Sequence, residues 1–286
     1  MCGIAGIASR SIVTMDDRRL VETMLRCLAH RGPDDQHALG AGRAILGARR
    51  LAIIDLDTGQ QPLVNEDGSI MVSQNGEIYD YIELRRDLEA AGHTMRTKGD
   101  TEVLVHAYEQ YGPRFPEHLR GMFAVALWDS NHQRLVLARD RLGKKPLYWR
   151  LADGRLTYGS ELKALLADPA TPRVIDEEAL ALYLQYQYIP APRTIFKGIQ
   201  KLPPASVLVW DGDEPKMSRY WAPEYEPKSS ADPQALLEEC LKILRDSVRL
   251  RLRSDEPLGV FLSGGMDSSV VTALMVEASE RTVRSY

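Results

Sequence analysis

Apolar residues in the first part of the chain recur at the three- and four-residue spacing of amphipathic helices. Three helices are predicted on this basis, over residues 14–28, 79–91 and 100–112. Thr14 and Asp17 form a helix-start pattern before the first. Gly92 supplies a stop after the second, and Asp100 is a favourable N-cap residue for the third.

Strand-like segments lie between and beyond these helices. They are predicted at residues 44–54, 70–74, 122–128, 134–139 and 147–151. Short polar turns at residues 129–131 and 140–144 join the last three, which predicts an antiparallel meander. Helices set against antiparallel sheets indicate an α+β domain.

The pattern changes near residue 190, where prolines become frequent and long periodic runs stop. We therefore predict three parts: a first domain over residues 2–190, a rim and linker over 191–231, and a second domain over 232–286. Asp232 and Pro233 supply an N-cap and a first-turn proline for a helix that opens the second domain.

The final segment has the pattern of one β-loop-α unit of a parallel α/β sheet. An apolar strand at residues 258–262 leads into a Gly- and Ser-rich loop, then an apolar helix over 270–278, and another strand begins near Thr282. One such unit cannot bury both faces of a parallel sheet. The sequence is therefore expected to be a fragment in which this second domain is only begun.

Composition narrows the function classes. A net charge of -4 disfavours general binding to nucleic acid or to an anionic membrane. Three widely spaced cysteines do not make a disulfide framework or a zinc site. The sequence contains neither an apolar run of membrane-spanning length nor a signal-peptide pattern, which predicts a cytoplasmic protein.

The second residue, Cys2, is the most informative candidate for chemistry. Removal of Met1 would place a free α-amine and a thiol on one residue. The reference pKa values of the two groups, about 8 and 8.5, both lie near cell pH, so the amine can take the proton of the thiol. Its position alone is also compatible with a cysteine that has no catalytic role, so the other candidate residues must decide between these two interpretations.

Three other segments could complete an amide-hydrolysing site. Asn75 and Gly76 offer an amide and a backbone N–H to a tetrahedral oxyanion, although an Asn-Gly pair is also a common turn. Arg50 could hold a carboxylate through two parallel bonds, or be a solvated surface residue. Asp100 could accept bonds from an ammonium group, or act only as a helix cap.

Several motifs together carry a resemblance to the class II glutamine amidotransferases. They occur in the order of that family over roughly residues 2–190. They are Cys2-Gly3-Ile4, His30-Arg31-Gly32-Pro33-Asp34, Arg50–Asp55, Asn75-Gly76-Glu77-Ile78-Tyr79, Gly99–Glu102, Arg120–Ala124, Asp140–Gly143 and Gly159–Lys163.

The resemblance implies a four-layer αββα domain of the N-terminal-nucleophile hydrolase type and assigns roles to its residues. Cys2 would be the nucleophile, and Asn75 and Gly76 would form the oxyanion hole. Arg50 and Asp100 would bind the α-carboxylate and α-amine of glutamine, with Glu77 in contact with the substrate.

The loop after the strand at 258–262 suits a phosphate. Its small residues let the backbone approach closely, and N–H groups at the helix start attract an anion. Asp267 is unfavourable beside a polyanion unless it meets Mg²⁺. A plain Gly-rich turn is the alternative. The motif resembles the pyrophosphate loop of ATP pyrophosphatases, which assigns ATP to Leu262, Ser263, Gly264, Gly265, Asp267, Ser268 and Ser269.

Among class II amidotransferases this combination resembles the glutamine-hydrolysing asparagine synthetases. That implies glutamine, aspartate and ATP with Mg²⁺ as small-molecule substrates and cofactors, no prosthetic group, and ammonia transfer to β-aspartyl-AMP. A homodimer stays open. One alternative is a related amidotransferase of polysaccharide biosynthesis that acts on another carboxylate. The other is a non-catalytic protein on the same scaffold, which the intact Cys2 disfavours.

Overall fold

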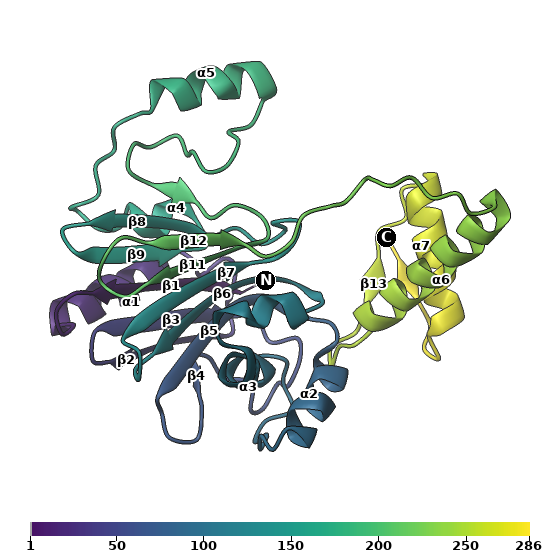
Figure 1. Ribbon diagram of the computed structural model, residues 1–286, viewed down its shortest axis with the longest axis horizontal. Coiled ribbons are helices and arrows are strands. Elements are labelled where there is room, and N and C mark those ends of the chain that lie inside the picture. Colours follow the sequence, from purple (N-terminus) through teal and green to yellow (C-terminus); the bar gives the residue numbers. More distant parts are fainter. Residues whose placement is uncertain (1) are drawn as a thin grey trace. The chain divides into compact units, whose positions relative to one another are not determined.

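The computed structural model describes residues 2–286, which divide into two compact units (Figure 1). The first unit contains residues 2–52 and 57–222. The second contains Ile53–Leu56 and Pro223–Tyr286. The predicted boundary at residue 190 falls inside the first unit.

Two antiparallel sheets form the centre of the first unit. One has the spatial order β10 (Gln200–Lys201), β8 (Tyr148–Ala152), β9 (Arg155–Gly159), β1 (Gly3–Ser9), β3 (Ala44–Arg50) and β2 (Asp35–Ala41). The other has the order β12 (Lys216–Arg219), β11 (Ser206–Trp210), β7 (Arg134–Arg139), β6 (Gly121–Asp129), β5 (Ile70–Ile78) and β4 (Leu63–Val64).

Three apolar cores hold the layers of this unit together. Ile4 and Leu46 of one sheet pack with Trp128 and Leu137 of the other in the core between the sheets. Helices α1 (Met15–Arg26) and α4 (Leu162–Leu165) cover the outer face of the first sheet. Helices α2 (Tyr81–Ala90) and α3 (Glu102–Tyr111), with the 3₁₀ helix η1 (Gly112–His118), cover that of the second (Figure 1). The predicted four-layer αββα architecture is confirmed.

The predicted helices are present, but the start of the third differs. Thr14 and Asp17 form the expected capping box of α1. α3 starts at Glu102, with Thr101 at the N-cap position. Asp100 therefore does not cap it. Its carboxylate turns back instead to accept hydrogen bonds from Ile78 N at 2.9 Å and Gln74 Nε2 at 3.1 Å.

Three strand predictions are corrected, and the first two concern β5 and the segment after β7. β5 continues to Ile78, and Asn75 and Gly76 pair with Ala124 and Phe123 of β6, so they do not form a turn. The predicted meander is wrong beyond β7, because β8 pairs with β9 in the other sheet. Asp140 stabilises this crossover, since its carboxylate accepts hydrogen bonds from the backbone N–H groups of Phe123, Leu142, Lys144 and Lys145.

The predicted strand at 44–54 ends early, at Arg50. The backbone N–H of Leu51 donates to the Cys2 thiol rather than to a neighbouring strand. Residues 191–222, assigned from sequence to a rim and linker, contribute strands instead, because Val207 and Leu208 of β11 pair with β7.

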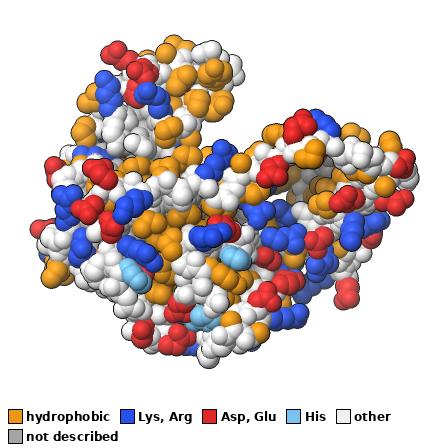
Figure 2. Space-filling model, in the orientation of Figure 1, with side chains coloured by type: hydrophobic (Ala, Val, Ile, Leu, Met, Phe, Trp, Pro, Cys, Tyr) orange, Lys and Arg blue, Asp and Glu red, His pale blue; other side chains and the backbone are white. Residues whose placement is uncertain are grey.

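Helix α5 (Glu177–Tyr186) packs little against the sheets. Ala179 is the buried residue of this helix. Figure 1 shows α5 set apart from the strands, and Figure 2 shows hydrophobic side chains gathered over it. The large apolar side chains exposed here are Leu180, Tyr183, Leu184, Tyr186 and Tyr188.

The second unit has the predicted β-loop-α pattern. Helix α6 (Pro233–Arg251) begins at Asp232, whose side chain caps it. Strand β13 (Gly259–Val260) precedes α7 (Met266–Ala278) and pairs in parallel with β14 (Arg284–Ser285). α7 begins four residues earlier than predicted, so half of the Gly-rich loop is helical.

None of the helices within residues 2–286 combines the length and apolar character needed to cross a membrane.

Candidate active site

Cys2 directly precedes strand β1 of the first sheet. Gly3 pairs with Arg49, which brings Cys2 beside the end of β3. Leu51 N donates a hydrogen bond to Cys2 Sγ at 3.4 Å. Burial raises the pKa of the Cys2 thiol and outweighs the opposing effects of the Leu51 hydrogen bond and the Arg50 charge. The thiol is therefore protonated at neutral pH and needs a base to become a nucleophile.

The backbone of Cys2 is held by an arginine to which sequence reasoning gave no role. Arg31 Nε donates to the carbonyl oxygen of Cys2 at 2.9 Å, and Arg31 Nη1 lies 2.9 Å from Glu161 Oε1. Burial raises the pKa of Glu161, but hydrogen bonds from Arg31, Lys163 and His30 outweigh it and lower this pKa to about 2. Glu161 is thus a fixed anion that orients Arg31. Both residues belong to motifs quoted above, which could have indicated them.

Asp100 is a buried carboxylate within electrostatic reach of the thiol. Burial raises its pKa to about 6, partly offset by hydrogen bonds from Ile78 N and Gln74 Nε2. Its negative charge also acts to raise the pKa of Cys2. A buried carboxylate of this kind would bind a cation strongly, because little solvent competes for it.

The segment before Asp100 is fixed by the buried Glu102. Its two carboxylate oxygens accept hydrogen bonds from the backbone N–H groups of Arg96 at 2.8 Å and Thr97 at 2.7 Å. This anchors residues 96–102 to the start of α3, and it holds the backbone around Asp100 in one position.

Asn75 presents a buried amide that lacks a hydrogen-bond partner within residues 2–286. The side chain is fully buried, and neither Oδ1 nor Nδ2 makes a hydrogen bond. Opposite residues on paired strands share a face, and the partner of Asn75, Ala124, belongs to the core between the sheets with Ile4 of β1. The Asn75 amide therefore faces the first sheet, which contains strand β1 directly after Cys2.

Gly76 is required by close backbone packing. Its φ is +152°, and a Cβ atom there would lie 2.0 Å from the carbonyl oxygen of Met122. Only glycine fits this position without displacing β6.

Arg49 and Arg50 point to opposite faces of the first sheet, because successive residues of a strand alternate between its two faces. Arg49 Nη1 donates to Gln36 Oε1 at 3.0 Å, on β2. Arg50 is buried, and its charge acts on the Cys2 thiol. Of the two arginines, Arg50 is thus the one whose charge acts on the Cys2 thiol.

Lys145 brings a buried positive charge to the same region. Burial lowers the pKa of Lys145, while the negative charges of Glu77 and Asp140 act to raise it. The charge of Glu77 also acts to raise the pKa of Asp100. The predicted residues Cys2, Arg50, Glu77 and Asp100 therefore share one electrostatic environment. Met1, whose removal was predicted, lies outside the described residues.

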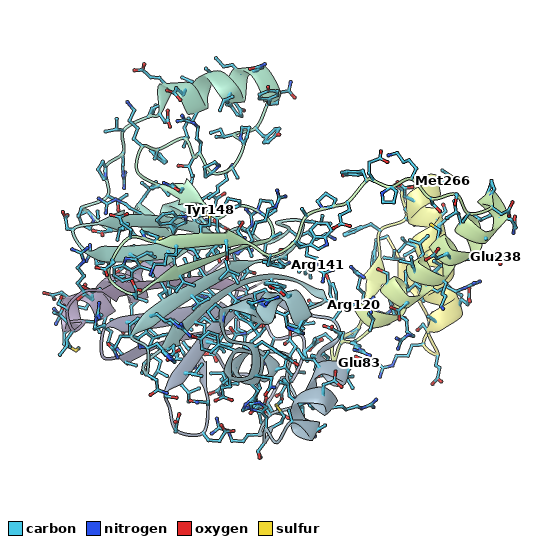
Figure 3. All side chains as sticks on the ribbon, in the orientation of Figure 1. Glu83, Arg120, Arg141, Tyr148, Glu238 and Met266 are labelled. Carbon is cyan, nitrogen blue, oxygen red and sulfur yellow. The ribbon has the colours of Figure 1, made fainter. Side chains whose placement is uncertain are left out.

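The Gly-rich loop of the second unit is exposed and bonded to itself. Ser263 Oγ and Ser268 Oγ lie 3.0 Å apart, and Ser269 Oγ donates to Gly265 O at 2.8 Å. Gly265 is the N-cap of α7 and gives no side-chain cap to its N–H groups. Figure 3 labels Met266 at this end of α7, where the residue is 80% exposed.

Both units of the chain resemble known protein families. Residues 1–221 match the family model of the glutamine amidotransferase domain, and residues 239–286 match that of asparagine synthase. Asparagine synthetase [glutamine-hydrolyzing] 1 of Bacillus subtilis is 38% identical over 97% of this chain and 44% of its own length. Amidase chyE of Penicillium rubens is 34% identical over 97% of this chain and 43% of its own length. The chain thus spans under half the length of these relatives.

A solved glutamine phosphoribosylpyrophosphate amidotransferase from B. subtilis has a similar fold, with a TM-score of 0.57 and 16% identity over 100% of this chain and 65% of the other. Because the domain model covers residues 1–221 of the 286, the chain belongs to the glutamine amidotransferase family.

Proposed function

We propose that the first unit is a glutaminase domain, which hydrolyses glutamine to glutamate and ammonia with Cys2 as its nucleophile. The observation that carries this proposal is the buried Asn75 amide. A buried polar group without a partner costs about 1–3 kcal/mol, and Asn75 has none within the described chain. An oxyanion formed in the layer that this amide faces would satisfy its N–H group.

The reaction needs one base, which the α-amine of Cys2 supplies after removal of Met1. The amine takes the thiol proton as sulfur attacks the amide carbon of glutamine. The oxyanion then collapses, the carbon–nitrogen bond breaks, and the protonated amine gives its proton to the departing ammonia. Water attacks the carbonyl carbon of the resulting thioester and gives a proton to the amine. The carbon–sulfur bond then breaks, which releases glutamate, and the amine returns its proton to the Cys2 sulfur. The raised pKa of the Cys2 thiol supports the need for this base.

Glutamine would be oriented by its charged end. Arg50 suits the α-carboxylate, since a guanidinium can form two parallel bonds to it. Asp100 suits the α-ammonium group, and with a pKa of about 6 it is ionised at neutral pH. Glu77 lies in the same electrostatic environment and would contact the substrate.

The test is glutamate release from glutamine by the chain after Met1 removal has been verified by mass. We expect Cys2→Ala to abolish release, and Cys27→Ala, a matched change of another partly buried cysteine, to leave it intact. Turnover by the folded Cys2→Ala protein would exclude this mechanism. Loss of turnover in both folded variants would show that the effect is not specific to Cys2, and it would count against Cys2 as the nucleophile.

The proposed base gives a second test on the wild-type chain. A form that keeps Met1 has no free amine on Cys2, so we expect it to lack glutaminase activity. Both forms should unfold at similar temperatures, which separates loss of the base from loss of the fold. An active form with Met1 attached would rule out the amine as the base.

We also propose that the second unit starts an ATP-dependent synthetase domain. The Gly265–Ser269 segment supports this, because uncapped N–H groups at the start of a helix bind anions. Ser263, Gly264 and Leu262 complete the proposed ATP contacts. Asp267 lies in the first turn of α7 and fits Mg²⁺, which proteins bind through one or two carboxylates together with substrate phosphates. The ion would neutralise phosphate charge.

The full-length protein is proposed to form asparagine from aspartate, with ATP consumed to AMP and pyrophosphate. The similarity to glutamine-hydrolysing asparagine synthetases supports this choice over a polysaccharide carboxylate. Assay of the full-length protein with ATP, glutamine and aspartate should give equal yields of asparagine and pyrophosphate. Glutamate without asparagine would leave the glutaminase proposal intact and exclude aspartate as acceptor. A cytoplasmic location and a homodimer stay predictions.

A further inference from the structure

Two histidines and a glutamate converge on the outer layer of the first unit, at α3. His106 and Glu109 are three residues apart on this helix, and His93 follows α2. One ligand atom from each lies within 4.8 Å of the other two. From this geometry we propose that His93, His106 and Glu109 form a binding site for a divalent transition-metal ion such as Zn²⁺, separate from the glutamine and ATP sites.

The distances suit such an ion. Glu109 Oε2 lies 2.7 Å from His106 Nδ1 and 3.2 Å from His93 Nδ1. A tetrahedral Zn²⁺ with bonds of about 2.0–2.1 Å separates its ligand atoms by about 3.3 Å. The ring centroids of the histidines lie 5.2 Å apart, and two imidazoles on one tetrahedral ion would be separated by roughly 5 Å. The contact between His106 and Glu109 would need to widen by about 0.6 Å to reach that separation.

Each of the three side chains is also contacted on the atom that would point away from the metal. His93 Nε2 lies 3.3 Å from Gln110 Oε1, and His106 Nε2 lies 3.7 Å from the Glu66 carboxylate. Asn65 Nδ2 donates to Glu109 Oε1 at 2.8 Å. Histidine ligands of metals almost always donate their second N–H to an oxygen, which fixes the ring orientation. Gln110 is within hydrogen-bond distance of His93 for this role, whereas Glu66 is beyond hydrogen-bond distance of His106.

Negative charge gathers at this cluster. His106 Nδ1 makes a hydrogen bond of 2.7 Å with Glu109 Oε2, and Glu66 Oε1 lies 3.7 Å from His106 Nε2. A divalent cation between His106 and Glu109 would replace that hydrogen bond, and both carboxylates would attract the ion.

One of the three proposed ligands, His106, is buried, and the other two lie nearer the surface. The side chain of His106 is 2% exposed, and those of His93 and Glu109 are 17% and 22% exposed. Three protein ligands leave one tetrahedral position, which water can reach past the two partly exposed residues. The ion would tie the segment after α2 to α3. Asp100 lies at the other end of that segment, so the metal would stiffen the connection that leads to the glutamine site.

The experiment is titration of the metal-free, full 286-residue chain with ZnCl₂ against a chromogenic chelator, with Co²⁺ absorption as a second readout. We expect about one equivalent of tightly bound metal and the intense visible bands of a four-coordinate Co²⁺ site. Glu109→Gln keeps the bond from Asn65 but removes the anionic ligand, and His93→Asn removes a ring at a partly exposed position. Each should weaken binding by more than about 100-fold, and Gln110→Ala by about 10–100-fold.

The matched control is His132→Asn. His132 Nδ1 lies 2.7 Å from Asp129 Oδ2 with the same three-residue spacing, but no third metal-binding side chain joins this pair within the described chain. The control should bind as the wild type does. Equal affinity of wild type and the folded His93→Asn and Glu109→Gln variants, or Co²⁺ bands typical of an exposed six-coordinate ion, would overturn the proposal.

Discussion

The two candidate sites of this chain differ in how they are held. The groups around Cys2 lie among buried strands, and Asp100 and Asn75 are 8% and 0% exposed. The Gly-rich loop of the second unit is exposed and is held by hydrogen bonds among its own serines. Three large apolar clusters support the first unit, whereas the cluster in the second contains Val248, Leu274 and Met275. The first site is thus pre-formed by tertiary packing, and the second by local bonding.

The largest expected effect tests this difference with one glycine from each region. Gly76→Ala would bring a Cβ atom to 2.0 Å from the carbonyl oxygen of Met122, whereas a Cβ atom at Gly264 meets nothing within 4 Å. We expect Gly76→Ala to lower the free energy of unfolding by at least about 4 kcal/mol. Gly264→Ala, with φ +79°, should cost only about 1–2 kcal/mol of backbone strain. Denaturant unfolding measures both, and equal costs would contradict the comparison.

The next effect separates catalysis from packing at Asn75. Loss of an oxyanion donor costs about 2.7–4 kcal/mol, or 100- to 1,000-fold in kcat. Because the amide makes no hydrogen bond in the described chain, Asn75→Ala should reduce kcat this far while its melting temperature falls little. The exposed Asn131→Ala serves as control. A large loss of stability with kcat unchanged would assign Asn75 a structural role instead.

Asp100 connects burial to pH dependence. Burial raises its pKa from 3.8 to about 6, so between these pH values the folded state binds more protons than the unfolded state. The free energy of unfolding should therefore decrease as pH rises through this window, and Asp100→Asn should remove that decrease. Unfolding measured at several pH values between 4 and 7 tests this, with the exposed Asp213→Asn as control.

The same carboxylate should control glutamine binding in the opposite direction. Below about pH 6 Asp100 becomes protonated, so KM for glutamine should rise as pH falls. Asp100→Asn should raise KM at neutral pH by about 10- to 100-fold, the cost of a lost charged hydrogen bond of about 1.5–3 kcal/mol. A KM that does not depend on pH between 5 and 7 would remove Asp100 from substrate binding.

The smallest effect is expected in the exposed loop. Ser263→Ala removes a bond to Ser268 of 3.0 Å between exposed hydroxyls, so the free energy of unfolding should change by less than about 0.5 kcal/mol. Glutaminase activity should be unchanged, because the change lies in the other unit. A fall in glutaminase kcat would show that the two regions are coupled.

The sequence alone determined the elements and the identity of the candidate residues. Periodicity and capping residues such as Thr14 depend on neighbours in the chain, so α1, α2 and the β-loop-α unit could be predicted from local patterns. The motif around Cys2 and Arg50 likewise indicated an amide-hydrolysing site.

Only the tertiary structure decided how these elements combine. β8 pairs with β9 in the other sheet, after a turn held by the Asp140 carboxylate, and the Asp100 carboxylate accepts a hydrogen bond from Ile78 N. His93 and His106 meet across the connection between two helices. These outcomes depend on contacts between residues far apart in the chain, whose free energy is decided by burial and pairing in the folded state, and no local pattern records them.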